Sequence, residues 1–292
     1  MKNKSFRYLS LIIPLCFFLL SPVFAQDRPS LMQVTPIIRH YAATSVKPVL
    51  DSCASRDRLG LLLKISDILI NSKTGLHVNA IKPSTYIIYD KLEKIKLGFL
   101  AAFSLSPEQK EILKTWRSKY MQHDPADVFF APSADDIVKT RAAFGCSHYA
   151  RSFIAVVKAL GLIDDPEDLR YVVSCKADDY NRAHAARDGE MTINGHQFAL
   201  VKQNSRWIAI NTSKSEWTAM PEGFSPDGII SPKNISVRFE SYPDVTFLIR
   251  KVGKDYNDDC DDDSLSNLMN IYRSGEAHDS HFKWDEFAAA NE

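Results

Sequence analysis

A cysteine stands at the start of a long helical pattern, in the segment Gly145-Cys146-Ser147. From Tyr149 to Leu160 the apolar residues recur at spacings of three and four, which is typical of one face of a helix. The first turn of a helix presents unused backbone N–H groups, and the helix dipole favours negative charge there. Because a thiol in that position is shifted toward thiolate, the pattern predicts Cys146 as a nucleophile. The alternative is a small residue of the core.

A thiol nucleophile needs a base, and the base needs a group that orients it. Two strand-like segments, 196–202 and 206–212, flank Asn204-Ser205 and indicate a β-hairpin. If these two residues form the turn, His196 and Asn211 become diagonal neighbours on one face, about 7–8 Å apart at the backbone. A shift of one residue would move Asn211 to the opposite face. The alternatives are an exposed histidine at a strand start and an asparagine that ends a strand.

The rest of the sequence indicates the elements that would carry these residues. Ser106, Pro107 and Gln109 form a capping-box pattern that predicts a helix start, and Gly161 would end the helix that begins near Cys146. Helical patterns dominate the first half and strand patterns the second, which favours an α+β fold over alternating βαβ units. We expect further helices at 56–71, 85–103, 106–122 and 133–144, and further strands at 171–175, 236–240 and 245–252.

These motifs also resemble a known family. The segments are Gly-Cys-Ser-His-Tyr-Ala at 145–150, Gly-His-Gln-Phe at 195–198, and the Trp-containing strand at 204–212. In this order and spacing they resemble the transglutaminase-like superfamily, which has a papain-like fold. The resemblance implies a papain-like transglutaminase core, in which the helix that carries the cysteine packs on an antiparallel sheet. A helical N-terminal extension would precede this core.

The resemblance also implies roles for particular residues. Cys146 would be the nucleophile, His196 the base and Trp207 a packing residue, while Asn211 falls on the third catalytic position. The family has Asp at that position, whereas papain-like proteases have Asn. Because an amide orients the imidazole without adding charge, the substitution bears on the rate of the reaction rather than on its type.

The implied chemistry is thiol-dependent acyl transfer on a protein, peptide or amide substrate. Water as the acceptor would make the protein a cysteine protease or amidase, and an amine as the acceptor would make it a transglutaminase. One alternative is a non-catalytic transglutaminase-like module that binds peptide or cell-wall material. Another is an enzyme whose N-terminal helices cover the cleft until proteolysis.

The first residues have the pattern of an export signal. A basic start with Lys2, Lys4 and Arg7 precedes an apolar run, and cleavage is expected after Ala25. The sequence has 36 basic and 36 acidic residues, so removal of these three basic residues leaves 33 against 36. That balance argues against a nucleic-acid partner, and no later segment has the length of a membrane span. We therefore expect a periplasmic or extracellular protein of presumed bacterial origin.

The expected organisation has four parts. A signal peptide at 1–25 and a helical region at 26–130 precede a transglutaminase-like catalytic domain at 131–275. A C-terminal tail occupies 276–292. The helical region would pack against the catalytic domain or cover its cleft.

The remaining reactive side chains receive less specific interpretations. With Cys146 kept as a thiol, one disulfide and one buried thiol is the simplest arrangement for Cys53, Cys175 and Cys260. His148 follows Cys146 by two residues, so we expect it at the surface or behind the site, and His184 could border the cleft. No cofactor and no metal are implied. The acidic run at 255–263 has Cys260 and Ser266 where a calcium loop needs Gly and Glu, which favours a solvated loop over weak cation binding.

Overall fold

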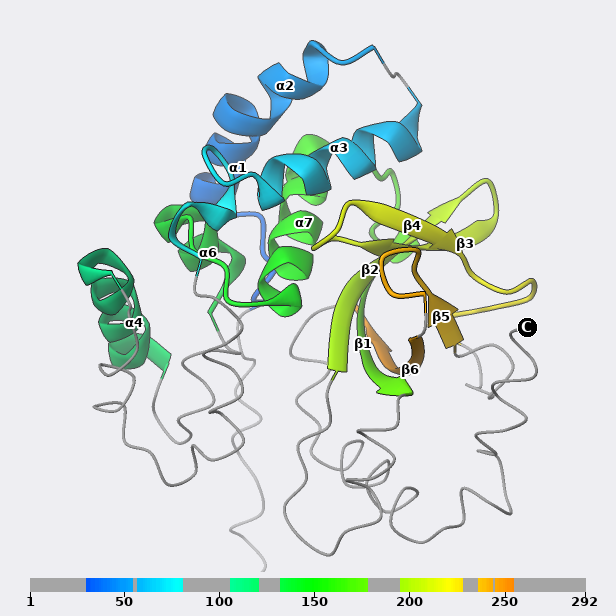
Figure 1. Cartoon of the computed structure of the whole chain (residues 1–292). Helices are drawn as coiled ribbons and strands as arrows, with labels where there is room; N and C mark the ends of the chain where they lie inside the picture. The colour runs from blue at the N-terminus through cyan, green and yellow to red at the C-terminus, as the bar shows by residue number, and fades with distance from the viewer. Residues whose placement is uncertain are drawn as a thin grey trace, which may run out of the picture.

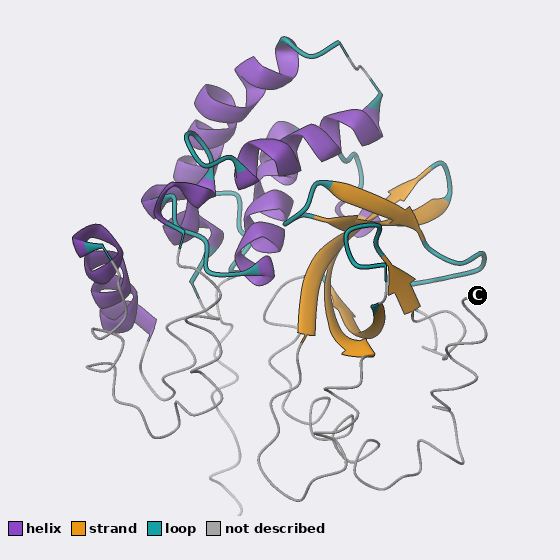
Figure 2. Cartoon of the chain, viewed as in Figure 1, coloured by secondary structure: helices purple, strands orange, loops and turns teal. Residues whose placement is uncertain are grey.

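The computed structural model describes residues 30–54, 57–80, 106–120, 132–177, 195–227, 236–243 and 245–254. These residues form an α+β structure in which helices cover one side of an antiparallel sheet (Figures 1 and 2). The predicted signal peptide, the helix expected at 85–103, the acidic run at 255–263 and the tail at 276–292 lie outside the described residues.

The described strands form one six-stranded sheet in the order β4-β3-β2-β1-β6-β5. Every neighbouring pair is antiparallel. In this order β2 and β1 are the two central strands, and β4 and β5 are the edge strands. The strands are β1 (Leu169–Ala177), β2 (Gly195–Gln203), β3 (Arg206–Asn211), β4 (Glu216–Ala219), β5 (Ser236–Arg238) and β6 (Thr246–Gly253).

The helices of the first half begin where the sequence offers capping side chains. The side chain of Asp57 accepts from the N–H of Gly60 at 2.8 Å, and Ser106 and Gln109 form the predicted capping box at 3.0 and 3.1 Å. The α-helices are α1 (Pro36–Tyr41), α2 (Lys47–Asp51), α3 (Arg58–Ile70), α4 (Pro107–Tyr120), α6 (Ala134–Thr140) and α7 (Cys146–Leu160). The described residues also form a π-helical segment, η1 (Ala42–Val46), and the 3-10 segments η2 (Leu76–Asn79) and η5 (Pro166–Asp168).

Three regions differ from the sequence-based expectations. No individual helix was assigned between residues 26 and 56, yet α1, η1 and α2 form a nearly continuous helix there. The helix expected at 133–144 ends at Thr140, because Arg141 adopts a left-handed conformation with φ of 49°. Strand β4 was not predicted, since its four residues follow β3 after a short turn and show no clear alternation.

Helix α7 is the centre of the helical layer. Its apolar pattern predicts one buried face, but every residue from Ser147 to Val157 is buried. The reason is that α7 packs on β1 and β2 and also contacts α1, α3 and α6. Gly161 ends the helix as predicted, with φ of 63° in the left-handed region.

A buried apolar cluster lies on each face of the sheet. The residues of β2 alternate between them: Ala199 and Val201 join the cluster that contains α7, whereas Phe198 and Leu200 join the opposite cluster. The α7 cluster also contains Leu62 of α3. It therefore combines residues from both sides of the boundary expected at residue 130.

The hairpin of β2 and β3 has the predicted register. Asn204 and Ser205 have φ of 49° and 66°, as the central residues of a type I′ turn require. Pairing runs from Gln203 opposite Arg206 to Ala199 opposite Ile210. This register is the one that brings His196 and Asn211 to the same face.

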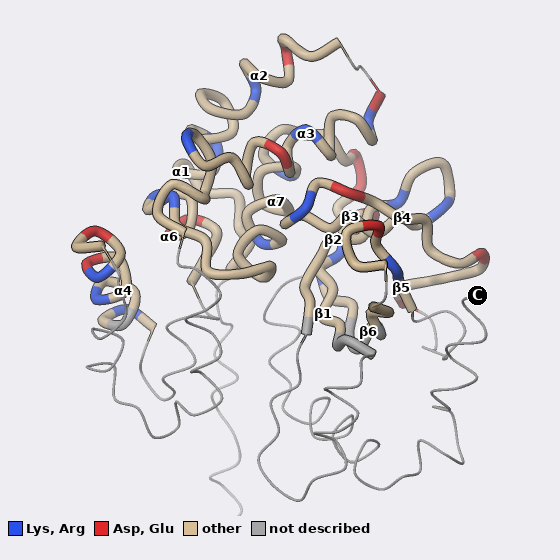
Figure 3. Tube along the Cα trace, viewed as in Figure 1, with Lys and Arg blue, Asp and Glu red and all other residues tan. Residues whose placement is uncertain are grey.

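Charged side chains are distributed over the helices and the turns at the strand ends. Figure 3 shows Lys and Arg interspersed with Asp and Glu along these elements. Among the residues that the structure describes, no helix combines the length and apolar character needed to cross a bilayer.

Candidate active site

Cys146 is the first residue of α7, and its side chain is half-buried. Gly145 precedes it with an extended backbone, so the chain enters the helix directly at the cysteine. The sulfur faces the start of β2: the backbone N–H of Gln197 lies 3.4 Å from Sγ, and Oε1 of Gln197 lies 2.8 Å from it. The thiol is thus placed beside the residue that follows His196.

Gln197 has two opposite effects on the sulfur. Its backbone N–H donates to Sγ, which favours thiolate, whereas its side-chain carbonyl oxygen accepts from the S–H and favours the neutral thiol. Sequence reasoning did not assign a role to Gln197. The available signal was its position directly after the predicted base.

His196 is almost fully buried at the start of β2, with 4% of its surface exposed. Its Nε2 lies 2.9 Å from Oδ1 of Asn211, so the predicted contact across the hairpin is confirmed. On the other side of the strand, the hydroxyl of Ser174 in β1 donates to the backbone carbonyl of His196 at 2.7 Å. Hydrogen bonds to the ring and to the backbone carbonyl therefore fix the position of His196.

Four aromatic rings surround the imidazole of His196. The ring of Phe247 is closest, with its centroid 5.0 Å away, and the other three lie at 5.9 to 6.1 Å. Such apolar surroundings disfavour a charged imidazolium unless a nearby group compensates the charge. The other rings belong to Phe198, Phe239 and Tyr242.

The orientation of the Asn211 amide follows from its second partner. Nδ2 of Asn211 lies 2.6 Å from Oε1 of Glu216, and an ionised carboxylate can only accept. Oδ1 must then face His196, so Nε2 of the imidazole carries the proton of that bond. The hydroxyl of Ser213 also donates to Oδ1, at 2.9 Å.

Tyr242 lies close enough to both Cys146 and Glu216 for their charges to act on its phenol. Burial raises the pKa of its phenol, and the negative charges of Cys146 and Glu216 raise that pKa further. Nζ of Lys214 stands 5.9 Å from the centroid of its ring. Tyr242 was not singled out in the sequence, since it follows a short strand and belongs to no recognised motif.

Of the two positions expected for His148, at the surface or behind the site, the surface is wrong, because the side chain lies in the interior. It is fully buried, and its Nδ1 accepts from the backbone N–H of Phe144 at 2.9 Å. The ring of Trp116 in α4 packs edge-on against it at 5.5 Å. A helix from a distant part of the sequence thus covers the side of α7 that we expected to be exposed.

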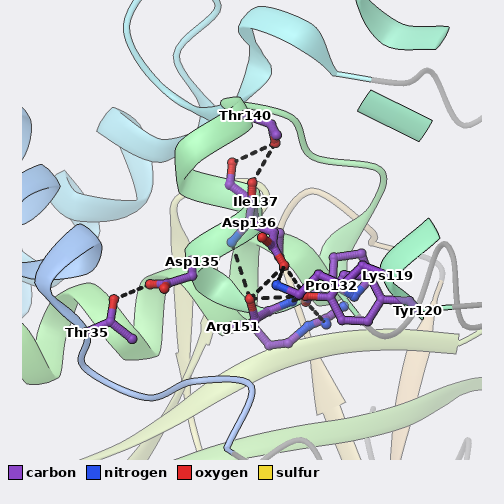
Figure 4. A network of polar contacts seen from close by, with 10 residues as sticks. Thr35, Lys119, Tyr120, Pro132, Asp135, Asp136, Ile137, Thr140 and Arg151 are labelled. Atoms are coloured by element: carbon purple, nitrogen blue, oxygen red, sulfur yellow. Dashed lines mark hydrogen bonds and ion pairs between the residues drawn. The ribbon is translucent and has the colours of Figure 1, made fainter. Parts of the chain in front are cut away.

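A buried arginine, Arg151, makes polar contacts with the first turn of α7 and with Pro132; Figure 4 shows the contact with Pro132. Arg151 donates from Nε to the carbonyl of Ser147 at 3.2 Å and from its guanidinium to the carbonyl of Pro132. The hydroxyl of Ser147 is 3.3 Å from the same guanidinium. Arg151 therefore connects the residue after Cys146 to the segment that leads into α6.

The same network attaches the end of α4 to α6 (Figure 4). The hydroxyl of Tyr120 donates to Asp136, and Nζ of Lys119 lies 2.6 Å from that carboxylate. Burial works against the charge of Lys119, but the hydrogen bond to Asp136 prevails and raises its pKa. At the start of α6, Ser133 accepts from the N–H of Asp136 at 3.3 Å.

The other residues singled out in the sequence have different surroundings. Trp207 is buried in the cluster on the face of the sheet opposite α7, with the guanidinium of Arg170 at 5.8 Å from its ring. Cys53 is a free thiol close to the carbonyl of Val49, at 3.2 Å. The described residues contain no group of three or more His, Cys, Asp or Glu that could hold a metal ion. Outside the described positions lie His184, Cys260 and the side chain of Cys175.

Comparison with family models, curated proteins and solved structures gave no match. The chemistry of the site therefore has to be argued from the residues themselves.

Proposed function

We propose that the protein is a thiol-dependent acyl-transfer enzyme of the transglutaminase-like type. Cys146 is the nucleophile, His196 the base and Asn211 the residue that orients the imidazole. The observation that carries the proposal is the 2.9 Å contact of Nε2 with Oδ1, together with a thiol at a helix start that contacts Gln197, the residue after His196. The packing of α7 on β1 and β2 supports a papain-like core for this site.

The reaction begins with the transfer of the thiol proton to His196. Because Asn211 holds Nε2, this transfer takes place at Nδ1. The thiolate attacks the carbonyl carbon of an amide or ester, and the electron pair of the C=O bond moves to oxygen. The backbone N–H of Cys146, at the first position of the helix, donates to that oxyanion.

The second half of the reaction returns the enzyme to its starting state. His196 gives its proton to the leaving amine or alcohol as the bond to the carbonyl carbon breaks, which leaves a thioester on Cys146. Water or an amine then attacks the thioester carbonyl carbon and transfers its proton to the imidazole. The C–S bond breaks, and the departing sulfur of Cys146 takes the proton back from His196. Water releases an acid, as in a protease or amidase, whereas an amine releases a new amide, as in a transglutaminase.

A labelling experiment tests the proposal. The purified chain from residue 26 onward is treated with a thiol-reactive amide mimic, and modification is located by mass spectrometry. Labelling is expected at Cys146, and both Cys146→Ala and His196→Ala should abolish it. Cys53→Ala is the matched control, because Cys53 is also a free thiol and should not matter. Equal labelling of all variants would contradict the proposal.

The substrate class is then found by profiling. The purified chain is incubated with peptide, isopeptide and cell-wall amide libraries, with and without an added amine, and Cys146→Ala serves as the blank. Hydrolysis alone identifies a protease or amidase, and a product that contains the amine identifies a transglutaminase. Failure to convert any amide while the thiol remains reactive would favour the alternative below.

The alternative is a non-catalytic module that binds peptide or cell-wall material in the same place. The observation that favours it is the 2.8 Å contact of Oε1 of Gln197 with Sγ of Cys146, since an acceptor there favours the neutral thiol. Strand alternation also turns the side chains of Gln197 and His196 to opposite faces of β2. Unchanged ligand affinity in Cys146→Ala, together with no turnover in wild type, would support the module.

The proposed location is outside the cytoplasm, in the periplasm or beyond. The proposal rests on the basic start, the apolar run and the small residues before the expected cleavage after Ala25. N-terminal sequencing of the protein recovered from a cell fraction tests it. A mature chain that begins at Gln26 is expected, and an uncleaved cytoplasmic chain would contradict it.

A further inference from the structure

We infer that Glu216 is a positioning residue that supplies to His196 the negative charge which Asn211 lacks. This inference rests on the proposed function. Asn211 and Glu216 stand directly opposite each other in the pairing of β3 with β4. The side chains of these two residues are in contact, and Nδ2 of Asn211 lies 2.6 Å from Oε1 of Glu216.

The three side chains form one directed chain of hydrogen bonds. Nε2 of His196 donates to Oδ1 of Asn211 at 2.9 Å, and Nδ2 of the same amide donates to Glu216 at 2.6 Å. The carboxylate draws charge from the amide nitrogen, which makes the conjugated amide oxygen a stronger acceptor. Hydrogen bonds linked in this way strengthen one another. A neutral amide thereby transmits the influence of a carboxylate to the imidazole.

Glu216 is held for this purpose from its other side. The backbone N–H of Ser241 donates to Oε2 at 2.8 Å, and the hydroxyl of Ser241 donates to Oε1. The phenol of Tyr242, from the segment after β5, lies within range of its charge, and Lys214 from the turn before β4 stands over the ring of that tyrosine. Because three donors from two segments fix the carboxylate, it keeps one orientation toward Asn211.

The charge is needed because of what surrounds the base. Proton transfer from Cys146 creates an imidazolium on a side chain that is 4% exposed and walled by four aromatic rings. An unpaired charge in such surroundings is costly, and within the described residues the chain through Asn211 leads from the ring to a carboxylate. The amide of Asn211 at the third position therefore needs no charge of its own. The negative charge is that of Glu216, which is hydrogen-bonded to the far side of this amide.

A charge-swap experiment tests the inference. The rate of alkylation of Cys146 by iodoacetamide is measured across pH in wild type, Glu216→Gln and the double variant Asn211→Asp/Glu216→Gln. Glu216→Gln keeps the shape but removes the charge, and the double variant moves the charge to residue 211. Glu222→Gln is the matched control, since it removes an equal charge from an exposed side chain.

In Glu216→Gln, we expect the alkaline limb of the rate profile to move to lower pH by about half a unit. This shift corresponds to about a threefold smaller population of the thiolate–imidazolium pair. The double variant should recover the wild-type profile, and Glu222→Gln should not differ from it. A Glu216→Gln profile that coincides with wild type, or a double variant that stays as low as the single one, would overturn the inference.

Two further readouts keep the test decisive. If Glu216→Gln does not fold, the double variant alone decides: a wild-type profile supports the inference, and an alkaline limb that lies about half a unit below that of wild type overturns it. Failure of the proposed function has a different signature. In that case wild type itself shows an ordinary thiol profile that His196→Ala does not change, whereas failure of the inference alone leaves the His196 dependence in place.

Discussion

Trp116 of α4 meets His148 of α7 edge to face, with the two ring centroids 5.5 Å apart. The contact lies two residues beyond Cys146 and joins the helical first half of the chain to the helix that carries the thiol. Trp116 is 1% exposed and His148 fully buried, so each ring completes the burial of the other. The N-terminal helices are therefore part of the environment of the candidate site.

Removal of this ring should destabilise the protein. Trp116→Ala leaves a cavity against α7, and we expect a loss of about 3–5 kcal/mol in the free energy of unfolding. Urea denaturation followed by circular dichroism measures the change. Trp116→Phe keeps an aromatic ring in place and should lose less than half as much. A loss below about 1 kcal/mol for Trp116→Ala would show that α4 contributes little to the fold.

Gln197 should control the reactivity of the thiol. Gln197→Glu places a carboxylate next to Sγ, and repulsion of the thiolate should raise the pKa of the thiol by about one unit or more. The rate of alkylation of Cys146 near pH 7 should then fall about tenfold, because a shift of one unit changes the thiolate fraction by that factor. Gln197→Ala removes the acceptor without adding charge and should react at least as fast as wild type. Equal rates for Gln197→Glu and wild type would contradict the placement of this side chain.

The turn of the β2–β3 hairpin should tolerate, and gain from, a glycine. Ser205 has φ of 66°, a conformation that costs a residue with a Cβ about 1–2 kcal/mol. Glycine avoids this strain but loses about 0.5–1 kcal/mol more in conformational entropy. Ser205→Gly should therefore stabilise the protein by roughly 0.5 kcal/mol, measured as a shift in the urea midpoint. Ser52 has φ of −84°, so Ser52→Gly should not stabilise, and equal gains at both positions would refute the explanation.

Alkaline pH should destabilise the protein through buried phenols. Burial raises the pKa of Tyr149 from 10.0 to about 12, so the folded state binds this proton more tightly than the unfolded chain does. Stability is unaffected below pH 10 and falls between pH 10 and about 12, with a total loss of about 2–3 kcal/mol for this group. Tyr149→Phe should lose correspondingly less over the same range.

Tyr41 provides a parallel case, because burial raises the pKa of its phenol to about 12 as well. Tyr41→Phe should show the same reduced sensitivity, and the two substitutions together should add, since they remove separate ionisations. The measurement is the free energy of unfolding from urea titrations at pH 9 and at pH 12. An unchanged alkaline loss in both variants would contradict the assignment.

The parts of the fold that sequence predicted are those set by local chemistry. The capping box of Ser106 and Gln109, the left-handed Gly161 and the turn at Asn204-Ser205 each act within a few residues. The two-residue turn then determines the register of the hairpin. For this reason the contact of His196 with Asn211 could be predicted from the sequence.

The missed features depend on partners far apart in the sequence. His148 is buried because Trp116, from another helix, covers it. Gln197 gains its role from the approach of α7, and Glu216 gains its role from Ser241, which is 25 residues away in the chain. Hydrophobic periodicity and capping patterns contain no information on such contacts. The roles of Gln197 and Glu216 could therefore be found only from the structure.

The four aromatic rings around His196 determine when, during synthesis of the chain, the surroundings of this histidine can form. Three of these rings, those of Phe239, Tyr242 and Phe247, come from the last described part of the sequence, and Phe247 follows Cys146 by 101 residues. Until β6 is available, the inner strand β1 also lacks one of its two neighbours. In a nascent chain, Cys146 is therefore synthesised long before these three rings that surround His196. Under the proposed function, the site cannot assemble before residue 247 has been synthesised, about a hundred residues after its thiol.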